Sequence, residues 1–264
     1  PDGTVDESFD PGSGFFYSPD PDYPNVYSMA LDMEGRILVG GAFDSYNGVS
    51  TGQLVRLSPD GVQDLSFAPV FEPEYSHVWD VLVMDDQRIR VAGYFTGVNG
   101  SEVTGIAGLL ADGAMDPLYV QGSLVDNVNV LLQDGEGILI AGWFETYGGV
   151  ERRYMARIDA NGGLDPDFDV GAGFAVGTGF QPYIHDMRSR PDGSVLVFGE
   201  FDSYNEVERI DILRLNGPDG SIDCNGVLGG TAFPGTPCDD EDPETLEDTW
   251  NTACDCVGVP IQPD

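Results

Sequence analysis

Lysine is absent from this chain of 264 residues, and its 11 arginines face 46 aspartates and glutamates, for a formal net charge of −35. A surface this acidic repels phosphate backbones and anionic lipid head groups, so neither nucleic acid nor a membrane surface is an expected partner. The sequence also lacks any run of 18 apolar residues, which argues against membrane insertion. Solvation of turns explains most of the carboxylates, and calcium binding is the sharper expectation for the densest clusters.

Residues with the spacing of a catalytic set are also missing. The two histidines, His77 and His185, do not occupy equivalent positions, no serine lies in a nucleophile elbow, and no Gly-rich phosphate loop carries a lysine. Acidic residues are so abundant that a glycosidase-like acid and base could be among them, and the candidates are Asp80, Asp126 and Asp186. We therefore expect that the protein is not an enzyme. Of the functions considered, a carbohydrate-active enzyme is the weakest alternative.

Glycine, at 36 residues, and proline, at 18, are both frequent, as is typical of short strands joined by tight turns. The chain contains four similar segments of about fifty residues and a leading partial one. The segments span residues 26–67, 78–119, 128–168 and 184–223, with residues 1–10 as the partial repeat. The given sequence therefore starts within a repeat, and its first residues do not have the pattern of a signal peptide. We expect a processed product or a segment of a longer protein.

Two ladders of residues keep the same period along the chain. The first is formed by phenylalanines and the second by turn glycines. They are Phe43, Phe95, Phe144 and Phe201, and Gly3, Gly61, Gly113, Gly162 and Gly220. Two independent ladders in step over this length establish a true repeat, and such self-similarity determines the fold class.

Each repeat is expected to form four short antiparallel strands. In the first repeat these are residues 26–31, 36–41 and 54–57, followed by a short strand ending at Phe67, with polar turns between them. Small residues end each second strand, as at Gly40-Gly41, and predict close approach of neighbouring repeats. Four strands in about fifty residues are typical of a β-propeller blade, so the fold class is all-β. The sequence leaves open whether the repeats close a ring or belong to a larger array.

The repeat resembles a known family. Within one unit, the motifs GRILVGGAF at residues 35–43, SYNGV at residues 45–49 and PDGxxDxSF at residues 59–67 are similar to the delta-60 bacterial repeat. The resemblance covers residues 1–223 and implies a β-propeller, an extracellular location and no catalytic residues. The second repeat departs from the motif, with Gly97-Val98-Asn99-Gly100 in place of the SYNG turn.

The last 41 residues have a different composition and predict a Cys- and Asp-rich minidomain over residues 224–264. All four cysteines lie here: Cys224, Cys238, Cys254 and Cys256. We expect two disulfides formed in an oxidising compartment, with Cys254 and Cys256 each reaching back to Cys224 or Cys238 in either connectivity. Zinc is disfavoured because the single Cys-x-Cys pair lacks the usual spacing.

The tail resembles a cysteine repeat of secreted and cell-surface proteins of the Bacteroidota, many of them exported by the type IX route. The residues that carry the resemblance are Asp223-Cys224, 229–232, 234–240, Asp248, Trp250-Asn251 and 254–256. Glu241 stands where that repeat usually has glycine. Candidate calcium ligands are Asp239, Asp240, Asp242 and Asp248. If calcium does not bind, residues 243–248 are expected to form one acid-capped helical turn.

These features predict a noncatalytic extracellular or cell-surface module for binding or adhesion, within a larger secreted protein. The alternative is a structural subunit of an extracellular fibre or sheath, in which repeats and tail contact neighbouring copies. Expected partners are a glycan or other cell-surface ligand, or further copies of the chain. Calcium is the one cofactor to be expected. In propellers, ligands often bind at the mouth of the central channel, although fold alone does not specify a ligand.

Overall fold

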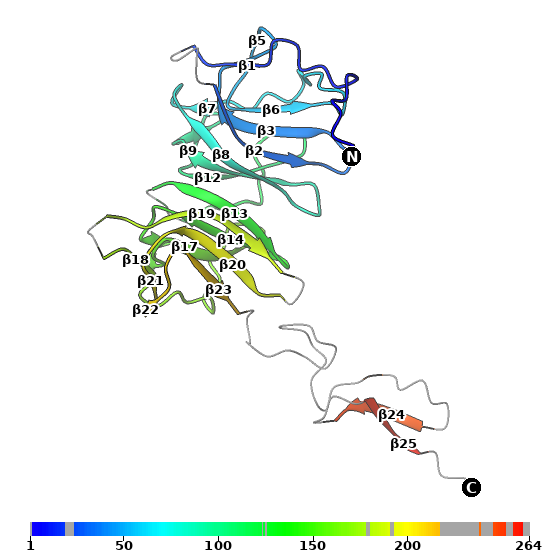
Figure 1. Cartoon of the computed structure of the whole chain (residues 1–264), viewed down its shortest axis with the longest axis vertical. Coiled ribbons are helices and arrows are strands. Elements are labelled where there is room, and N and C mark those ends of the chain that lie inside the picture. The colour runs from blue at the N-terminus through cyan, green and yellow to red at the C-terminus, as the bar shows by residue number, and fades with distance from the viewer. Residues whose placement is uncertain are drawn as a thin grey trace. The chain divides into compact units, whose positions relative to one another are not determined.

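A computed structural model gives an all-β structure (Figure 1). It describes residues 2–18, 24–122, 124, 126–177, 180–190, 193–216, 238, 245–251 and 256–260. Among these residues no helix could cross a membrane. The chain forms two compact units, Pro1–Asp186 with Gly199–Asp211, and Met187–Phe198 with Ile212–Asp264. The boundary predicted between residues 223 and 224 falls outside the described residues.

Each repeat contains an antiparallel sheet of three strands. In the first repeat β2 (Asn25–Leu31), β3 (Ile37–Ala42) and β6 (Leu54–Leu57) pair in that order. The corresponding strands are β8 (His77–Val83), β9 (Ile89–Tyr94) and β12 (Ile106–Leu109); β13 (Val128–Asp134), β14 (Gly137–Gly142) and β17 (Met155–Asp159); and β19 (Tyr183–Ser189), β20 (Val195–Glu200) and β23 (Ile212–Leu215). The first strands β2, β8 and β13 of successive repeats lie side by side (Figure 1).

The prediction of a single four-stranded sheet per repeat needs correction. The segment expected to be a polar turn is a separate hairpin, β4 (Ser45–Tyr46) and β5 (Val49–Ser50), which pairs with β1 (Phe15–Phe16). The equivalents are β7 (Phe71–Glu72), β10 (Gly97–Val98) and β11 (Ser101–Glu102); β15 (Thr146–Tyr147) and β16 (Val150–Glu151); and β18 (Phe174–Ala175), β21 (Ser203–Tyr204) and β22 (Val207–Glu208).

The expected fourth strand is reduced to one bridge in each of the first three repeats, for example Leu57 with Gln63. Asp64 ends the pairing, because its Oδ1 accepts a hydrogen bond from the backbone N–H of Ser66 at 2.9 Å and bends the chain into an Asx turn. Asp116 and Asp165 receive the equivalent bonds from the backbone of residues 118 and 167.

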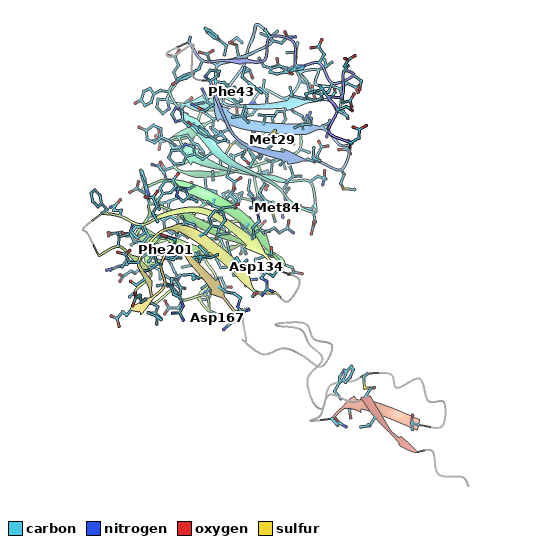
Figure 2. All side chains as sticks on the ribbon, viewed as in Figure 1. Met29, Phe43, Met84, Asp134, Asp167 and Phe201 are labelled. Atoms are coloured by element: carbon cyan, nitrogen blue, oxygen red, sulfur yellow. A yellow bond between two sulfur atoms is a disulfide. The ribbon has the colours of Figure 1, made fainter. Side chains whose placement is uncertain are left out.

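The core contains the middle strands and the repeated aromatics, as predicted. Side chains of β3, β9 and β14 are almost entirely buried, and so are the four ladder phenylalanines, two of which are labelled in Figure 2. The Tyr46 hydroxyl donates to the carbonyl of Gly61 at 2.8 Å, and Tyr147 donates to Gly162 in the same way. In the divergent second repeat the Asn99 amide donates to the carbonyl of Gly113 instead. The hairpin there is unchanged.

The small residues that end the second strands have two distinct roles. A Cβ on Gly40 would lie 2.6 Å from a methyl of Val78 in the next repeat, which is the close approach between repeats that the sequence predicts. The following glycine is needed for another reason. A Cβ on Gly93 would lie 2.0 Å from the carbonyl oxygen of His77, on the paired strand of the same repeat. Gly41, Gly142 and Gly199 face equivalent carbonyl groups.

An arginine joins each of the first two repeats to the next. Arg56 pairs with Asp64 at 2.7 Å, and its Cζ lies 4.6 Å from the ring centroid of Phe67. Its Nη1 also donates to the carbonyl of Ala111, in the turn of the second repeat. One guanidinium therefore holds its own repeat closed and binds the following one. The turn glycine beside Ala111, Gly113, has φ +88° and packs against Phe67, so a side chain there would be strained and crowded.

The second repeat keeps this interaction although its arginine is on a different strand. Gly108 replaces the arginine of β12, and Arg90 of the paired strand β9 supplies the guanidinium. Arg90 pairs with Asp116 at 3.1 Å, lies over the Tyr119 ring at 4.7 Å, and donates to the carbonyl of Ala160 at 2.6 Å. Arg90 and Asp116 are 0% and 1% exposed, so neither charge could be left unpaired without a large cost.

The tail contributes a two-stranded sheet of β24 (Thr245–Trp250) and β25 (Cys256–Pro260) to the second unit. Residues 245–248 are thus extended, and the helical turn expected for this segment is wrong. Cys238 and Cys256 form a disulfide, consistent with one of the two predicted connectivities. Cys224 and Cys254 lie outside the described residues.

Moving the arginine of the second repeat from β9 to β12 tests whether the two positions are interchangeable. Arg90→Leu leaves Asp116 buried without its main cation and should lower the free energy of unfolding by about 3 to 5 kcal/mol. The double variant Arg90→Leu/Gly108→Arg places the cation on β12, as in the first repeat, where Leu38 faces Arg56. A Cβ at position 108 would lie 2.5 Å from the Cβ of Tyr119, which must shift, so we expect only part of the loss to be recovered. Urea denaturation measures both. A double variant no more stable than Arg90→Leu would contradict this account.

Asp64 gives the fold a defined dependence on acid. The Ser66 hydroxyl, and then Arg56, hold the pKa of the Asp64 carboxyl at about 2, below its ordinary value of 3.8. The stabilisation is complete above about pH 4 and disappears as the pH falls through 2, and it amounts to about 2 kcal/mol at most. Asp64→Asn should therefore be less stable than the parent at pH 6, with the difference shrinking toward pH 2. A difference that stays constant over this range would refute the assignment.

Candidate binding site

A β-bulge interrupts the first strand of each of the first three repeats. The pairing register shifts around Tyr27 in β2, around Trp79 in β8 and around Asn129 in β13. A bulge adds one residue to a strand and redirects its side chain. His185 has the same repeat position in β19. These four side chains therefore come from equivalent places in four repeats.

The four residues line one pocket of about 370 Å³, together with Trp143 and Tyr183, and all six belong to the first compact unit. The ring centroids of Trp143 and Tyr183 are 5.6 Å apart and edge-on, and those of Tyr183 and His185 are 4.8 Å apart. Tyr27 and Trp143 are 46% and 39% exposed, so their rings remain accessible. The volume is in the lower part of the range for small-molecule sites.

Asn129 is the amide side chain in this lining, and it has no hydrogen-bond partner. Its side chain is 7% exposed, and neither Oδ1 nor Nδ2 makes a hydrogen bond. A primary amide offers two donors and one acceptor oxygen, and leaving such groups unpaired in a buried place costs about 1 to 3 kcal/mol. The fold gains nothing from this arrangement that the structure shows.

A second group of rings continues the aromatic surface near Tyr27. The ring of His77 lies 6.2 Å from Tyr27 and 6.5 Å from Tyr94, between centroids, and Tyr75 stacks on Tyr94 at 6.1 Å. Partial burial lowers the pKa of His77, which favours its neutral form. Tyr75 and Tyr94 are 57% and 38% exposed. A soluble surface rarely exposes so many rings together unless they contact something.

Asp80, one residue beyond the bulge of β8, ties three repeats together. Its Oδ1 accepts from the Ser28 hydroxyl at 2.8 Å and from its neighbour's backbone, and its Oδ2 accepts from the backbone N–H of Leu131 at 2.8 Å. Burial raises the pKa of this carboxyl and the nearby Asp186 adds to the effect, while the hydrogen bonds from Leu131 and Ser28 oppose it. The carboxylate is thus used as a structural cross-link.

The three candidate carboxylates for glycoside hydrolysis are not equivalent in the structure. Asp186 follows the bulge position of β19 and is close enough to raise the pKa of Asp80. Asp126 precedes β13, is exposed, and accepts a hydrogen bond from the backbone of Asn127 at 3.2 Å. None of the three lines the aromatic pocket.

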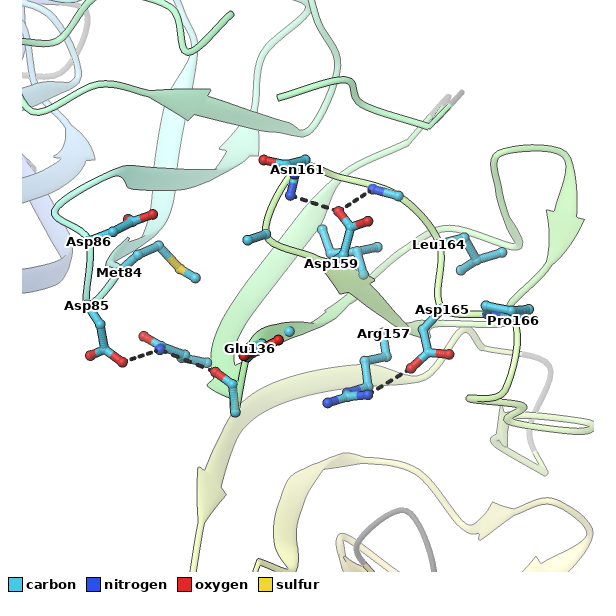
Figure 3. A pocket seen from close by; sticks show the side chains of 16 residues that line it. Met84, Asp85, Asp86, Glu136, Arg157, Asp159, Asn161, Leu164, Asp165 and Pro166 are labelled. Atoms are coloured by element: carbon cyan, nitrogen blue, oxygen red, sulfur yellow. Dashed lines mark hydrogen bonds and ion pairs between the residues drawn. The ribbon is translucent and has the colours of Figure 1, made fainter. Parts of the chain in front are cut away.

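A larger pocket of about 750 Å³ lies elsewhere on the first unit, among the turns of the second and third repeats (Figure 3). It is rich in carboxylates, but these have structural partners. Asp159 accepts from the backbone of Asn161 and Gly163 at 2.7 and 2.9 Å, and Asp165 pairs with Arg157 at 2.8 Å. Their placement is explained by turn formation and ion pairing, as expected for most acidic residues of this chain.

The calcium ligands predicted in the tail are largely beyond reach of the structure. Asp239, Asp240 and Asp242 lie outside the described residues, and Asp248 lies in β24, where only the backbone is described. Within the described part of the chain no three His, Cys, Asp or Glu side chains are grouped as a metal site would require. Calcium binding by the tail stays a prediction.

The aromatic pocket could have been found by aligning the repeats. Their first residues, Val26, Val78, Val128 and Ile184, are alike, and the next residue differs in every repeat. A position that varies within a regular frame is a candidate for recognition. What the sequence does not reveal is the bulge in β2, β8 and β13, which redirects the side chain at this position.

Four repeats of antiparallel sheets, linked through their turns, define a β-propeller repeat protein. The model of a family described as a beta-propeller domain of unknown function (DUF5122) matches residues 35–67, 86–119, 137–168 and 190–223, half of the chain. The chain belongs to this family. No curated protein matches the sequence.

Several solved structures have a distant similarity to the chain. The computationally designed Ika4 protein is 11% identical, with a TM-score of 0.43, over 72% of this chain and 91% of that one. The extracellular domain of a B. thetaiotaomicron protein is 14% identical, with a TM-score of 0.41, over 86% of this chain and 26% of that one. A family 43 glycoside hydrolase, YxiA of Bacillus licheniformis, is 16% identical, with a TM-score of 0.35, over 85% and 58%. Scores this low leave function to be argued from the chain's own residues.

Separate replacements of Asp80 and Asp126 test whether Asp80 is a structural cross-link and Asp126 an exposed surface residue. Asp80→Ala removes acceptors from Ser28 and Leu131 and should cost about 2 to 4 kcal/mol of stability, because buried donors lose their partner. Asp126→Ala should change stability by less than about 0.5 kcal/mol. Chemical denaturation of both variants provides the measurement. Equal effects would show that Asp80 does not hold the repeats together.

Proposed function

We propose that this chain is a noncatalytic binding module of a larger secreted or cell-surface protein. The observation that carries the proposal is the aromatic pocket, to which four repeats each contribute the side chain at the bulge position. Accessible rings around a few polar groups are the usual composition of a ligand site. The repeated sheets form the rigid frame that such a site requires.

The disulfide and the net charge of the chain support an extracellular location. The disulfide between Cys238 and Cys256 is of a kind that persists in oxidising compartments. The net charge of −35 keeps such a surface soluble and favours partners that are neutral or cationic. The family match adds a propeller repeat whose activity is not specified.

The carboxylates support binding over catalysis. A glycosidase needs two carboxyl groups that flank one bond, about 5 to 9.5 Å apart, in contact with the substrate. Asp80 instead makes hydrogen bonds to Ser28 and Leu131, and Asp126 is on an exposed loop outside the pocket. Asp186 lies near Asp80, but none of these three candidate carboxylates lines the aromatic pocket, so they give the alternative of a carbohydrate-active enzyme no support at that site.

The proposal predicts saturable binding without turnover. The purified chain is first examined by light scattering, with and without a calcium chelator, and then passed over immobilised polysaccharides, glycoproteins and matrix proteins. We expect a monodisperse monomer that binds at least one polymer, and mass spectrometry should find that polymer unchanged. Product release would favour the enzyme. Long regular assemblies formed by the protein alone would favour the fibre subunit. Failure to bind any of the immobilised polymers would overturn the proposed binding module.

A further inference from the structure

We propose that the pocket lined by Tyr27, Trp79, Asn129 and His185 binds a neutral pyranose unit of a glycan, with Asn129 as its hydrogen-bonding group and Trp79 and Trp143 as its stacking surfaces. This inference rests on the proposed function and names the chemistry of the ligand. It follows from three features of the pocket: an unpaired amide, several aromatic rings and a lack of cationic side chains.

The unpaired amide calls for a ligand that both donates and accepts. Asn129 leaves Oδ1 and Nδ2 without partners at a place that is 7% exposed. A sugar carries hydroxyl groups on neighbouring carbons, and each hydroxyl is a donor and an acceptor. Two adjacent hydroxyls can therefore pair with both ends of one amide. Both amide atoms are buried, so binding requires the side chains that line the pocket with Asn129 to move and uncover the amide.

The rings call for a ligand with a flat apolar face. Trp79, Trp143, Tyr27 and Tyr183 surround the same pocket. A pyranose presents C–H groups on its faces and hydroxyls at its edge, so it can lie on an aromatic face while its edge reaches a polar group. The pocket volume of about 370 Å³ suits a short stretch of a glycan better than the surface of a folded protein.

The charges call for a neutral sugar. No arginine lines the pocket, and lysine is absent from the whole chain. The adjoining charged groups are acidic: Glu200 lies 3.2 Å from the Nε2 of His185. Within a protein of charge −35, a uronic or sulfated sugar would be repelled with no cation to compensate.

Tryptophan fluorescence provides a readout confined to this pocket. The chain has three tryptophans, and two of them, Trp79 and Trp143, line the site. In the full chain carrying Trp250→Phe, emission should change saturably on titration with at least one neutral hexasaccharide from a set of gluco-, manno-, xylo- and galacto-oligosaccharides. Hexagalacturonate is the charged probe and should cause no change.

Two variants test the named residues. Asn129→Leu fills the same space without an unpaired amide, so the thermal midpoint should stay the same or rise while the affinity falls about tenfold. Trp79→Ala should weaken binding by at least the same factor. Phe180→Ala is the matched control, because Phe180 is 77% exposed, lies in the same unit and is not part of the pocket. It should leave the affinity unchanged.

Each contrary result has a separate meaning. If the chain binds an immobilised polymer but no hexasaccharide alters the emission, the glycan assignment fails and the binding module stands. If sugars bind and Asn129→Leu binds equally well, the position of the site is wrong. Tighter binding of hexagalacturonate than of the neutral probes would overturn the preference for neutral sugars. Binding to neither the immobilised polymers nor the hexasaccharides would overturn this inference and the proposed function together.

Discussion

Cohesion between the first three repeats depends on a guanidinium group that serves two repeats at once. Arg56 neutralises Asp64 in its own repeat, lies over an aromatic ring and reaches the turn carbonyl of Ala111 in the next repeat. Arg90 does the same one repeat later. In a chain with a charge of −35, cations are scarce, and a planar fork with five donors satisfies more acceptors than an ammonium group could. The contact spans 55 residues from Arg56 to Ala111 and 70 residues from Arg90 to Ala160, so its place in the fold is kept although the sequence distance is not.

The sequence predicts those parts of the fold that recur in every repeat. Phe43 and its three equivalents are buried because each middle strand is covered on both faces, and such strands are recognisable as apolar runs. The exchange of Arg90 for an arginine at position 108 was not predictable, since only the pairing of those two residues across β9 and β12 shows that they can substitute for each other. The early end of the fourth strand is likewise tertiary, because it requires Asp64 to turn toward Ser66 and Arg56 together.

The site was predicted less well than the fold, for a physical reason. Sequence patterns report which side chains alternate along a strand, and a bulge breaks that alternation at one residue. His77 and His185 illustrate the difficulty: they are at different repeat positions, so the alignment does not relate them, and yet both lie among aromatic rings. Asp80 is one of the three candidate acids predicted from the sequence, and the structure shows that it is instead a buried cross-link between β2 and β13.

The β-bulges and the Asp80 cross-link together explain how the same repeated sheets can carry a different side chain at the bulge position of each repeat. The glycine opposite each bulge, such as Gly93, leaves room for a carbonyl that a larger residue would displace, so the distortion is built into the frame. The bulge residue itself contributes little to the core, which allows tyrosine, tryptophan, asparagine and histidine to occupy equivalent places. Asn129 is the costly choice among them, because its amide is buried without a partner. A fold that needs only filled space at this position would be better served by an apolar side chain, so the amide is better explained by a ligand than by stability.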